Sequence, residues 1–175
     1  MQSDATVLVT GGAGFIGSNY VRMIADQHPD WSIRVLDLLT YCGNPANLAG
    51  LEDRITFVHG DIADASIVDS VVSGCNAVVN FAAESHVDRS LIDSRPFIRT
   101  NVEGTQVLLD ASRRNDVDRF LHVSTDEVYG DLAGTTHHSL ESDVFRPRSP
   151  YAASKAAFDM YLVSVHRFSD FPMNI

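Results

Sequence analysis

Residues 6–17 read Thr-Val-Leu-Val-Thr-Gly-Gly-Ala-Gly-Phe-Ile-Gly. The short apolar run at 6–10 is rich in β-branched residues and predicts a strand, and the spacing of apolar residues beyond it predicts a helix from about Phe15 to His28. Between them, Gly11 suits a tight turn, Gly14 lets a pyrophosphate approach the backbone, and Gly17 lets the helix pack close to the strand. The stretch therefore predicts a dinucleotide-binding turn. A glycine-rich turn without a ligand is the alternative.

The same order of strand and helix continues along the chain. Strands are expected at 33–36, 55–59, 77–81 and 120–123, with the start of a sixth at 172–175, and one helical turn is expected around Leu48. Helices are expected at about 65–73, 96–115 and 151–168, the last beginning at Ser149-Pro150. Alternation of this kind predicts an α/β fold: a doubly wound, Rossmann-type parallel sheet with helices on both faces and ligands beyond the carboxyl ends of the strands. We expect one NAD-binding domain over residues 1–175.

Two aspartates lie where the second and third strands end. Asp37 suits hydrogen bonding to ribose hydroxyls. Its charge would repel a 2′-phosphate, and Leu38 and Leu39 follow it instead of an arginine, so the expected cofactor is NAD rather than NADP. Asp37 could also simply end a strand before a loop. Asp61 could bind the adenine amino group, or it could cap the helix expected from Ala65.

Composition narrows the class of protein. The chain has 175 residues and a formal net charge of −10, without a basic block that could neutralise a nucleic-acid backbone. No apolar run reaches the roughly 18 residues of a membrane span, and no signal peptide is expected, so we expect a soluble, cytoplasmic protein. The two cysteines fit no metal-ligand spacing, and no metal is expected. Eighteen Asp against five Glu and one Lys indicate either adaptation to high salt or an ordinary acidic surface.

The only lysine of the chain is Lys155, four residues after Tyr151. On a helix the two side chains share a face. An ammonium beside a phenol favours the phenolate, and bringing a tyrosine from a pKa near 10 toward neutrality takes about 4 kcal/mol. Such a phenolate can take a proton from an alcohol while a hydride leaves to NAD, and Thr125 at the end of the fifth strand can hydrogen-bond the same oxygen.

Five segments together resemble the extended short-chain dehydrogenase/reductase superfamily, and most closely the dTDP-glucose 4,6-dehydratases. They are residues 10–17, 39–44 (Leu-Thr-Tyr-Cys-Gly-Asn), 82–90, 124–130 (Ser-Thr-Asp-Glu-Val-Tyr-Gly) and 149–155 (Ser-Pro-Tyr-Ala-Ala-Ser-Lys). The resemblance implies a lyase of deoxysugar biosynthesis that uses NAD. It implies cofactor contacts from Gly11, Gly14, Phe15, Ile16, Gly17, Asp37, Thr40, Asp61, Ile62, Ala82, Ala83, Asn101, Tyr151 and Lys155, and substrate contacts from Ser85, His86 and Thr125.

The resemblance also implies a reaction. Thr125, Tyr151 and Lys155 would oxidise C4 of a nucleotide-linked hexose; Glu127 would then remove the C5 proton and Asp126 protonate the departing C6 hydroxyl. Return of the hydride to C6 gives a 4-keto-6-deoxy sugar nucleotide. The two carboxylates need opposite protonation states, which their proximity and burial are expected to provide. Ordinary turn residues are the alternative.

Members of the family continue for well over a hundred further residues, which form a substrate domain, and we expect that domain to be absent here. Three alternatives stay open: a nucleotide-sugar 4-epimerase, a UDP-glucuronate decarboxylase, or a catalytically silent NAD-binding module. The resemblance also implies a homodimer.

Overall fold

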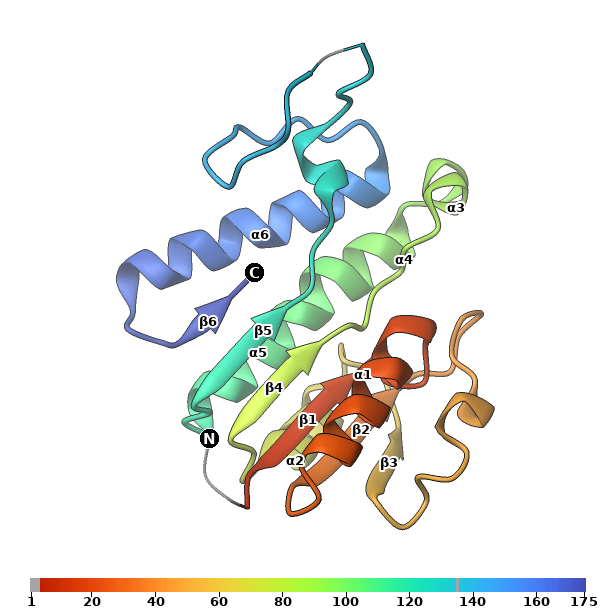
Figure 1. Ribbon diagram of the computed structural model, residues 1–175. Helices are drawn as coiled ribbons and strands as arrows, with labels where there is room; N and C mark the ends of the chain where they lie inside the picture. Colours follow the sequence, from red (N-terminus) through yellow and green to blue (C-terminus); the bar gives the residue numbers. More distant parts are fainter. Residues whose placement is uncertain (1–3, 135) are drawn as a thin grey trace.

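The protein is described by a computed structural model for residues 4–134 and 136–175. Its centre is a six-stranded parallel sheet in the order β3-β2-β1-β4-β5-β6 (Figure 1). The strands are β1 (Thr6–Thr10), β2 (Ser32–Asp37), β3 (Ile55–His59), β4 (Ala77–Asn80), β5 (Arg119–His122) and β6 (Met173–Asn174). This order reverses direction between β1 and β4, the switch point at which ligands bind in open α/β sheets. The predicted Rossmann-type fold is confirmed.

Helices cover both faces of the sheet. Figure 1 shows α1 (Phe15–Gln27) in front of the strands, with α2 (Ala65–Val72) and α5 (Thr105–Arg114) behind them. The remaining helices are α3 (Val87–Ile92), α4 (Arg95–Phe97), α6 (Pro150–Phe168), the π-helical segment η2 (Ile98–Gly104) and the 3₁₀ turns η1 (Pro45–Leu48) and η3 (Asp126–Tyr129). No helix among the described residues is long and apolar enough to cross a membrane.

The strand alternation divides the core into two layers. Leu8, Leu36, Val78 and Phe120 point to the face packed by α2, α5 and α6. Their neighbours along the strands, such as Val7, Val9, Ile33, Val35 and Val79, point to the face packed by α1 and η1. Successive side chains alternate between faces, so strands buried on both sides read as continuous apolar runs, as they do in this sequence.

The helix expected over 96–115 is not one regular α-helix. The chain passes from α4 through the π-helical turn η2 into α5. Asn101, at the centre of η2, is fully buried and bonds both backbone groups of Glu84 and the hydroxyl of Ser154. A π-bulge re-aims one side chain within a helix, and here it joins the segment after β4 to α6. The periodicity of the sequence could not reveal this, because both partners are remote along the chain.

The glycine turn after β1 is close-packed. Gly11 has a φ of +67°, and a Cβ there would lie 2.6 Å from the backbone nitrogen of Ala82. At Gly17 a Cβ would lie 2.3 Å from the Gly11 carbonyl oxygen. The two glycines therefore fix the turn and bring α1 against it, as predicted from their spacing.

The start of α6 is also as predicted. Ser149 accepts a hydrogen bond from the backbone N–H of Ala152 at 3.0 Å, and Pro150 occupies the first turn. This cap fixes the point at which α6 begins, one residue before Tyr151.

Candidate active site

One cavity of about 330 Å³ opens at the carboxyl ends of β1, β2, β4 and β5. Its volume lies within the range of small-molecule sites. Fourteen of the predicted site residues line it: Gly11, Gly14, Phe15, Ile16, Gly17, Asp37, Thr40, Asp61, Ile62, Ala82, Ala83, Ser85, Tyr151 and Lys155. The tertiary structure therefore gathers residues from both ends of the sequence at one site.

The amino end of α1 faces this cavity. Gly14 caps the helix without a side-chain hydrogen bond, and its first turn has no acidic residue. The backbone N–H groups of such a turn, together with the helix dipole, bind phosphate groups. A Cβ at Gly14 would meet only the Gly11 carbonyl oxygen within 4 Å, at 3.3 Å, so little protein crowds this side of the glycine. Phe15 is 82% exposed beside the opening. The site fits a pyrophosphate.

Asp37 is held by backbone groups. One carboxylate oxygen accepts from Ala13 N at 2.9 Å and the other from Leu39 N at 2.8 Å, and the residue is buried. A Cβ at Gly43 would approach the carboxylate to 2.7 Å. The group is therefore fixed between the glycine turn and the following loop. Each oxygen keeps a further lone pair for a hydroxyl donor.

Asp61 lies at the same edge but does not cap α2. That cap is Asp64, whose carboxylate accepts from Ser66 N and Ile67 N, so the capping alternative for Asp61 is wrong. Asp61 instead accepts from Ala63 N at 2.8 Å and pairs with Arg99 at 2.9 Å. It lines the cavity, where a base amino group could donate to it.

The segment after β4 forms another wall. Ala82 and Ala83 line the cavity, and Ser85 N donates to the Tyr41 hydroxyl at 3.3 Å. Arg89 stacks on the Tyr41 ring at 4.1 Å. His86 is the N-cap residue of the short helix α3, which was not predicted from the sequence. Among the described residues His86 does not line the cavity but lies at its rim, next to Ser85.

Asn101 also takes a different place from the one predicted. It is fully buried, its amide groups are occupied by Glu84 and Ser154, and it is not part of the cavity lining. The reason is the π-helical turn, which directs this side chain inward between two elements. Asn101 therefore positions the wall formed by Glu84 and Ser85.

The carboxylate pair lies in the 3₁₀ turn η3 directly after β5. Thr125 caps this turn by accepting from Glu127 N at 3.3 Å, and its hydroxyl lies 3.5 Å from a carboxylate oxygen of Asp126. Asp126 and Glu127 are exposed. The burial expected to separate their protonation states is thus not found in this structure, because both side chains are exposed while Val128 of the same turn is buried.

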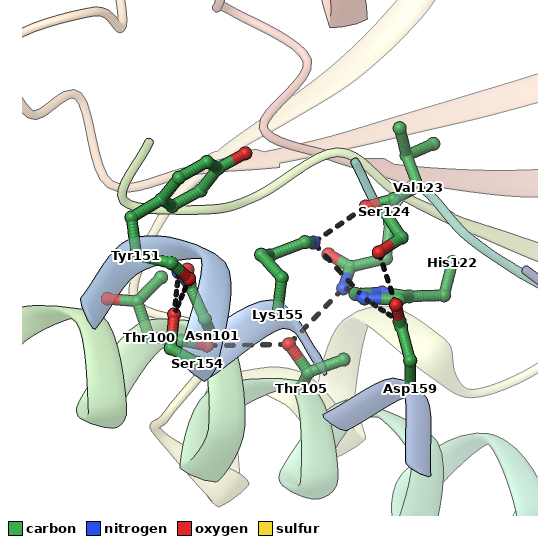
Figure 2. A network of polar contacts seen from close by, with 11 residues as sticks. Thr100, Asn101, Thr105, His122, Val123, Ser124, Tyr151, Ser154, Lys155 and Asp159 are labelled. Carbon is green, nitrogen blue, oxygen red and sulfur yellow. Dashed lines mark hydrogen bonds and ion pairs between the residues drawn. The ribbon is translucent and has the colours of Figure 1, made fainter. Parts of the chain in front are cut away.

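Tyr151 and Lys155 share the cavity but do not form the expected pair. Among the described residues no hydrogen bond joins them; Figure 2 shows the Lys155 amine directed to Val123 and His122 instead. Burial raises the pKa of Tyr151, and the carboxylates of Glu127 and Asp126 raise it further, against the lowering effect of the Thr125 hydroxyl. The expected lowering by the ammonium is therefore wrong for this structure. The same carboxylate effects show that η3 and Tyr151 lie within electrostatic reach.

The sequence reading missed the groups beneath Lys155. His122 and Asp159 are each 1% exposed, and Asn80 is buried beside them. His122 Nε2 lies 3.1 Å from Lys155 Nζ, and Asp159 accepts from the Ser124 hydroxyl at 2.5 Å. Two features of the sequence could have revealed these groups: a polar residue at the end of each inner strand, and an aspartate four residues after the lysine. No group of three His, Cys, Asp or Glu side chains suited to a metal ion occurs in the described part of the chain.

These features define a class: a Rossmann fold of the dinucleotide-binding type, with a tyrosine and a lysine in the lining of the cavity at the carboxyl ends of the strands. Residues 8–175 match the GDP-mannose 4,6 dehydratase family, and the chain belongs to that family. A curated relative, the low-salt glycan biosynthesis protein Agl12 of Haloferax volcanii, is 52% identical over 168 residues, which are 95% of this chain and 53% of the relative. The chain spans about half the length of the curated relatives it matches.

Solved structures of sugar-nucleotide enzymes also resemble this chain. DesIV, a dTDP-glucose 4,6-dehydratase from Streptomyces venezuelae with NAD and TYD bound, superposes with a TM-score of 0.89 at 48% identity, over 96% of this chain and 53% of DesIV. A UDP-N-acetylglucosamine 4-epimerase from Methanobrevibacter ruminantium gives 0.87 at 29% identity, over 98% and 54%. The predicted resemblance to sugar-nucleotide dehydratases of the extended short-chain dehydrogenase/reductase superfamily is confirmed.

Proposed function

We propose that the chain is the NAD-binding domain, residues 1–175, of a sugar-nucleotide 4,6-dehydratase that acts on dTDP-glucose. The observation that carries this is that one cavity is lined by the amino end of α1, by an aspartate fixed by backbone groups, and by Tyr151 with Lys155. The similarity to DesIV supports the choice of reaction and cofactor.

The residues fit NAD in three parts. The first turn of α1 would hold the pyrophosphate, Asp37 the ribose hydroxyls of the adenosine half, and Asp61 the adenine amino group. When bound, NAD accepts a hydride and later returns it. Tyr151 would hold or take the proton of the C4 hydroxyl of the sugar, and the Thr125 hydroxyl would orient the same oxygen.

Side chains of η3 would carry out the elimination step. Glu127 would take the C5 proton and Asp126 would give a proton to the leaving C6 hydroxyl, which requires one ionised and one protonated carboxyl group. Both side chains stand exposed beside Tyr151. Bound substrate would have to exclude water from them, since burial is one of the effects that separates two carboxyl pKa values.

The first experiment measures product. The chain is incubated with NAD and dTDP-glucose, and the alkali-induced absorbance of a 4-keto sugar is followed. Product formation supports the dehydratase. NAD binding by calorimetry without any product would instead favour a catalytically silent NAD-binding module, and failure to bind NAD would contradict the proposal as a whole.

The second experiment uses Glu127→Gln. The dehydratase should lose most elimination, about 10²-fold or more as for a missing general base, while transient NADH absorbance at 340 nm persists. Glu141→Gln, an exposed glutamate in the loop after η3, is the matched control and should leave turnover unchanged. A 4-epimerase, which shares the fold, would tolerate Glu127→Gln and interconvert the C4 epimers of its substrate; a UDP-glucuronate decarboxylase would release CO₂ from UDP-glucuronate.

We also propose a homodimer through α6. Met160 and Val163 are large apolar residues exposed on this helix, which makes its outer face suitable for a second copy. Light scattering after size exclusion should give twice the chain mass, and a monomer at micromolar concentration would contradict the dimer.

A further inference from the structure

A buried polar network lies beneath the catalytic end of the cavity. It runs from β1 through β4 and β5 to α6. Figure 2 shows the part of it that surrounds Lys155. Lys155 is 2% exposed and Asp159 1%. The side chains involved are Thr10, Asn80, Thr105, His122, Ser124, Lys155 and Asp159. A charge buried to this degree must be balanced nearby.

One hydrogen-bond donor in this network lacks an acceptor. The Asn80 amide donates to His122 Nδ1 at 3.1 Å, so the proton of the neutral ring is on Nε2. Nε2 lies 3.1 Å from Lys155 Nζ, which already donates to the Val123 carbonyl at 2.6 Å. An ammonium and a ring N–H are both donors. The Nε2 proton therefore needs another acceptor.

Asp159 carries a free acceptor close to this donor, although the two atoms are beyond hydrogen-bond distance. Its Oδ2 is occupied by the Ser124 hydroxyl at 2.5 Å, whereas its Oδ1 is a buried side-chain oxygen without a hydrogen-bond partner among the described residues. Oδ1 lies 3.8 Å from His122 Nε2. The unused acceptor thus lies within ion-pair distance of the ring nitrogen that also contacts Lys155, which brings a negative charge close to the lysine.

We propose that Asp159 is a positioning residue: its carboxylate, fixed by Ser124, is the counter-ion that keeps the buried Lys155 protonated, with its amine held at the cavity by the Val123 carbonyl. The network then carries one positive and one negative charge around a neutral imidazole. Burial lowers the pKa of Lys155 to about 8, and Asp159 opposes that fall. Any role of this lysine in NAD chemistry rests on the proposed function. The proposal that Asp159 keeps Lys155 charged does not depend on that function.

Few other titratable groups surround this lysine. Tyr151 and Asp159 lie on α6, and His122 comes from β5, where burial and the Lys155 charge hold its pKa well below the usual value. Glu84, on the segment after β4, lines the same cavity, and burial raises its pKa. From η2, the uncharged Asn101 donates a hydrogen bond to Ser154 on α6. Asp159 is thus the one carboxylate within the buried network itself.

The chain offers a direct test because Lys155 is its only lysine. Lysine labelled with ¹³C at Cε gives a single side-chain NMR signal, whose titration reports the pKa without any activity measurement. In Asp159→Asn the Lys155 pKa should fall by about one unit or more, since an opposite charge within a few ångströms shifts a pKa by that much. Asp159→Glu should restore most of it. Asp26→Asn, an exposed aspartate on α1, removes the same charge and should change nothing.

An unchanged lysine pKa in folded Asp159→Asn would overturn the proposal. If that variant does not fold, titration of the unaltered chain still tests the proposal. The Lys155 signal should then show a second inflection at acidic pH, where Asp159 takes up its proton. In Asp159→Glu the pH of this inflection should shift. A lysine signal without that inflection would overturn it equally. Calorimetric NAD binding of the same variants separates this result from the proposed function, because a normal lysine titration with no NAD binding contradicts only the latter.

Discussion

The two ends of the cavity are built differently. At the end proposed to bind the cofactor, the geometry is set by the backbone: the turn at Gly11, the open first turn of α1, and two N–H groups that hold the Asp37 carboxylate. At the catalytic end they come from side chains on separate elements, with Lys155 in a buried network and the pair Asp126-Glu127 exposed. Backbone geometry is set locally by glycine and aspartate, whereas the charge state of a buried lysine depends on remote partners.

This difference predicts how substitutions at each end of the cavity impair the protein. Changes at the cofactor end should act through steric fit and affinity and depend little on pH. Changes at the catalytic end should act through protonation, and their effect should vary with pH. The three predictions below test this contrast.

The largest effect is expected for Gly17→Ala. The new Cβ would lie 2.3 Å from the Gly11 carbonyl and 2.9 Å from Gly12 Cα, both backbone atoms that cannot rotate away. We expect a loss of about 3 kcal/mol in the free energy of unfolding, the upper part of the range for overpacking. Urea denaturation followed by circular dichroism measures it.

Gly14→Ala is the matched control for this prediction. Its Cβ would meet a single atom at 3.3 Å, so the fold should persist while NAD affinity falls. Equal stability of the Gly17→Ala variant and the unaltered chain would show that the turn relaxes and that the cofactor end is not rigid.

Asp37→Asn should come next. An amide presents a donor to Ala13 N or Leu39 N, where both carboxylate oxygens now accept, and it removes the charge that repels a 2′-phosphate. NAD affinity should fall about tenfold or more, roughly 1.4 kcal/mol or above, and the preference over NADP should shrink. Calorimetric titration with both cofactors measures the ratio, with Asp53→Asn, at an exposed aspartate, as control. A ratio that stays the same would remove Asp37 from cofactor selection.

The smallest effect concerns the pH dependence of stability. The pKa of buried His122 is held well below 6.5, so below that pH the unfolded ring binds a proton that the folded ring does not. Stability from this group is fully present above pH 6.5 and is lost as pH falls, by up to about 1.4 kcal/mol per pH unit. The raised pKa of Asp159 acts in the opposite direction, since the folded carboxyl group binds its proton first.

His122→Asn isolates the histidine contribution. Thermal or urea unfolding between pH 4.5 and 7.5 should show a steeper acid loss for the unaltered chain than for this variant. Parallel curves would mean that His122 titrates normally and that the network beneath Lys155 is not closed to water.

The order of elements was predictable because it depends on local rules. The apolar, β-branched run at 6–10, the glycine spacing and the Ser149-Pro150 start each act within a few residues. The elements β1, β3, α2 and α6 lie where they were expected to within a residue or two. The π-helical turn at Asn101 and the cap at Asp64 were missed. The first depends on Glu84 and Ser154, which are remote in sequence, and the second on which of two neighbouring aspartates reaches the helix end.

The sequence by itself determined the Rossmann-type fold, the glycine turn, the position of Asp37 at a strand end and the placing of Tyr151 and Lys155 on one helix. The tertiary structure alone decided where the Lys155 amine points, which hydroxyl Asp159 binds, and that Asn101 positions a wall instead of lining the cavity. The reason is physical: turns and helix starts are fixed by neighbouring residues, whereas the partners of a buried polar group are chosen by packing between elements far apart in the chain.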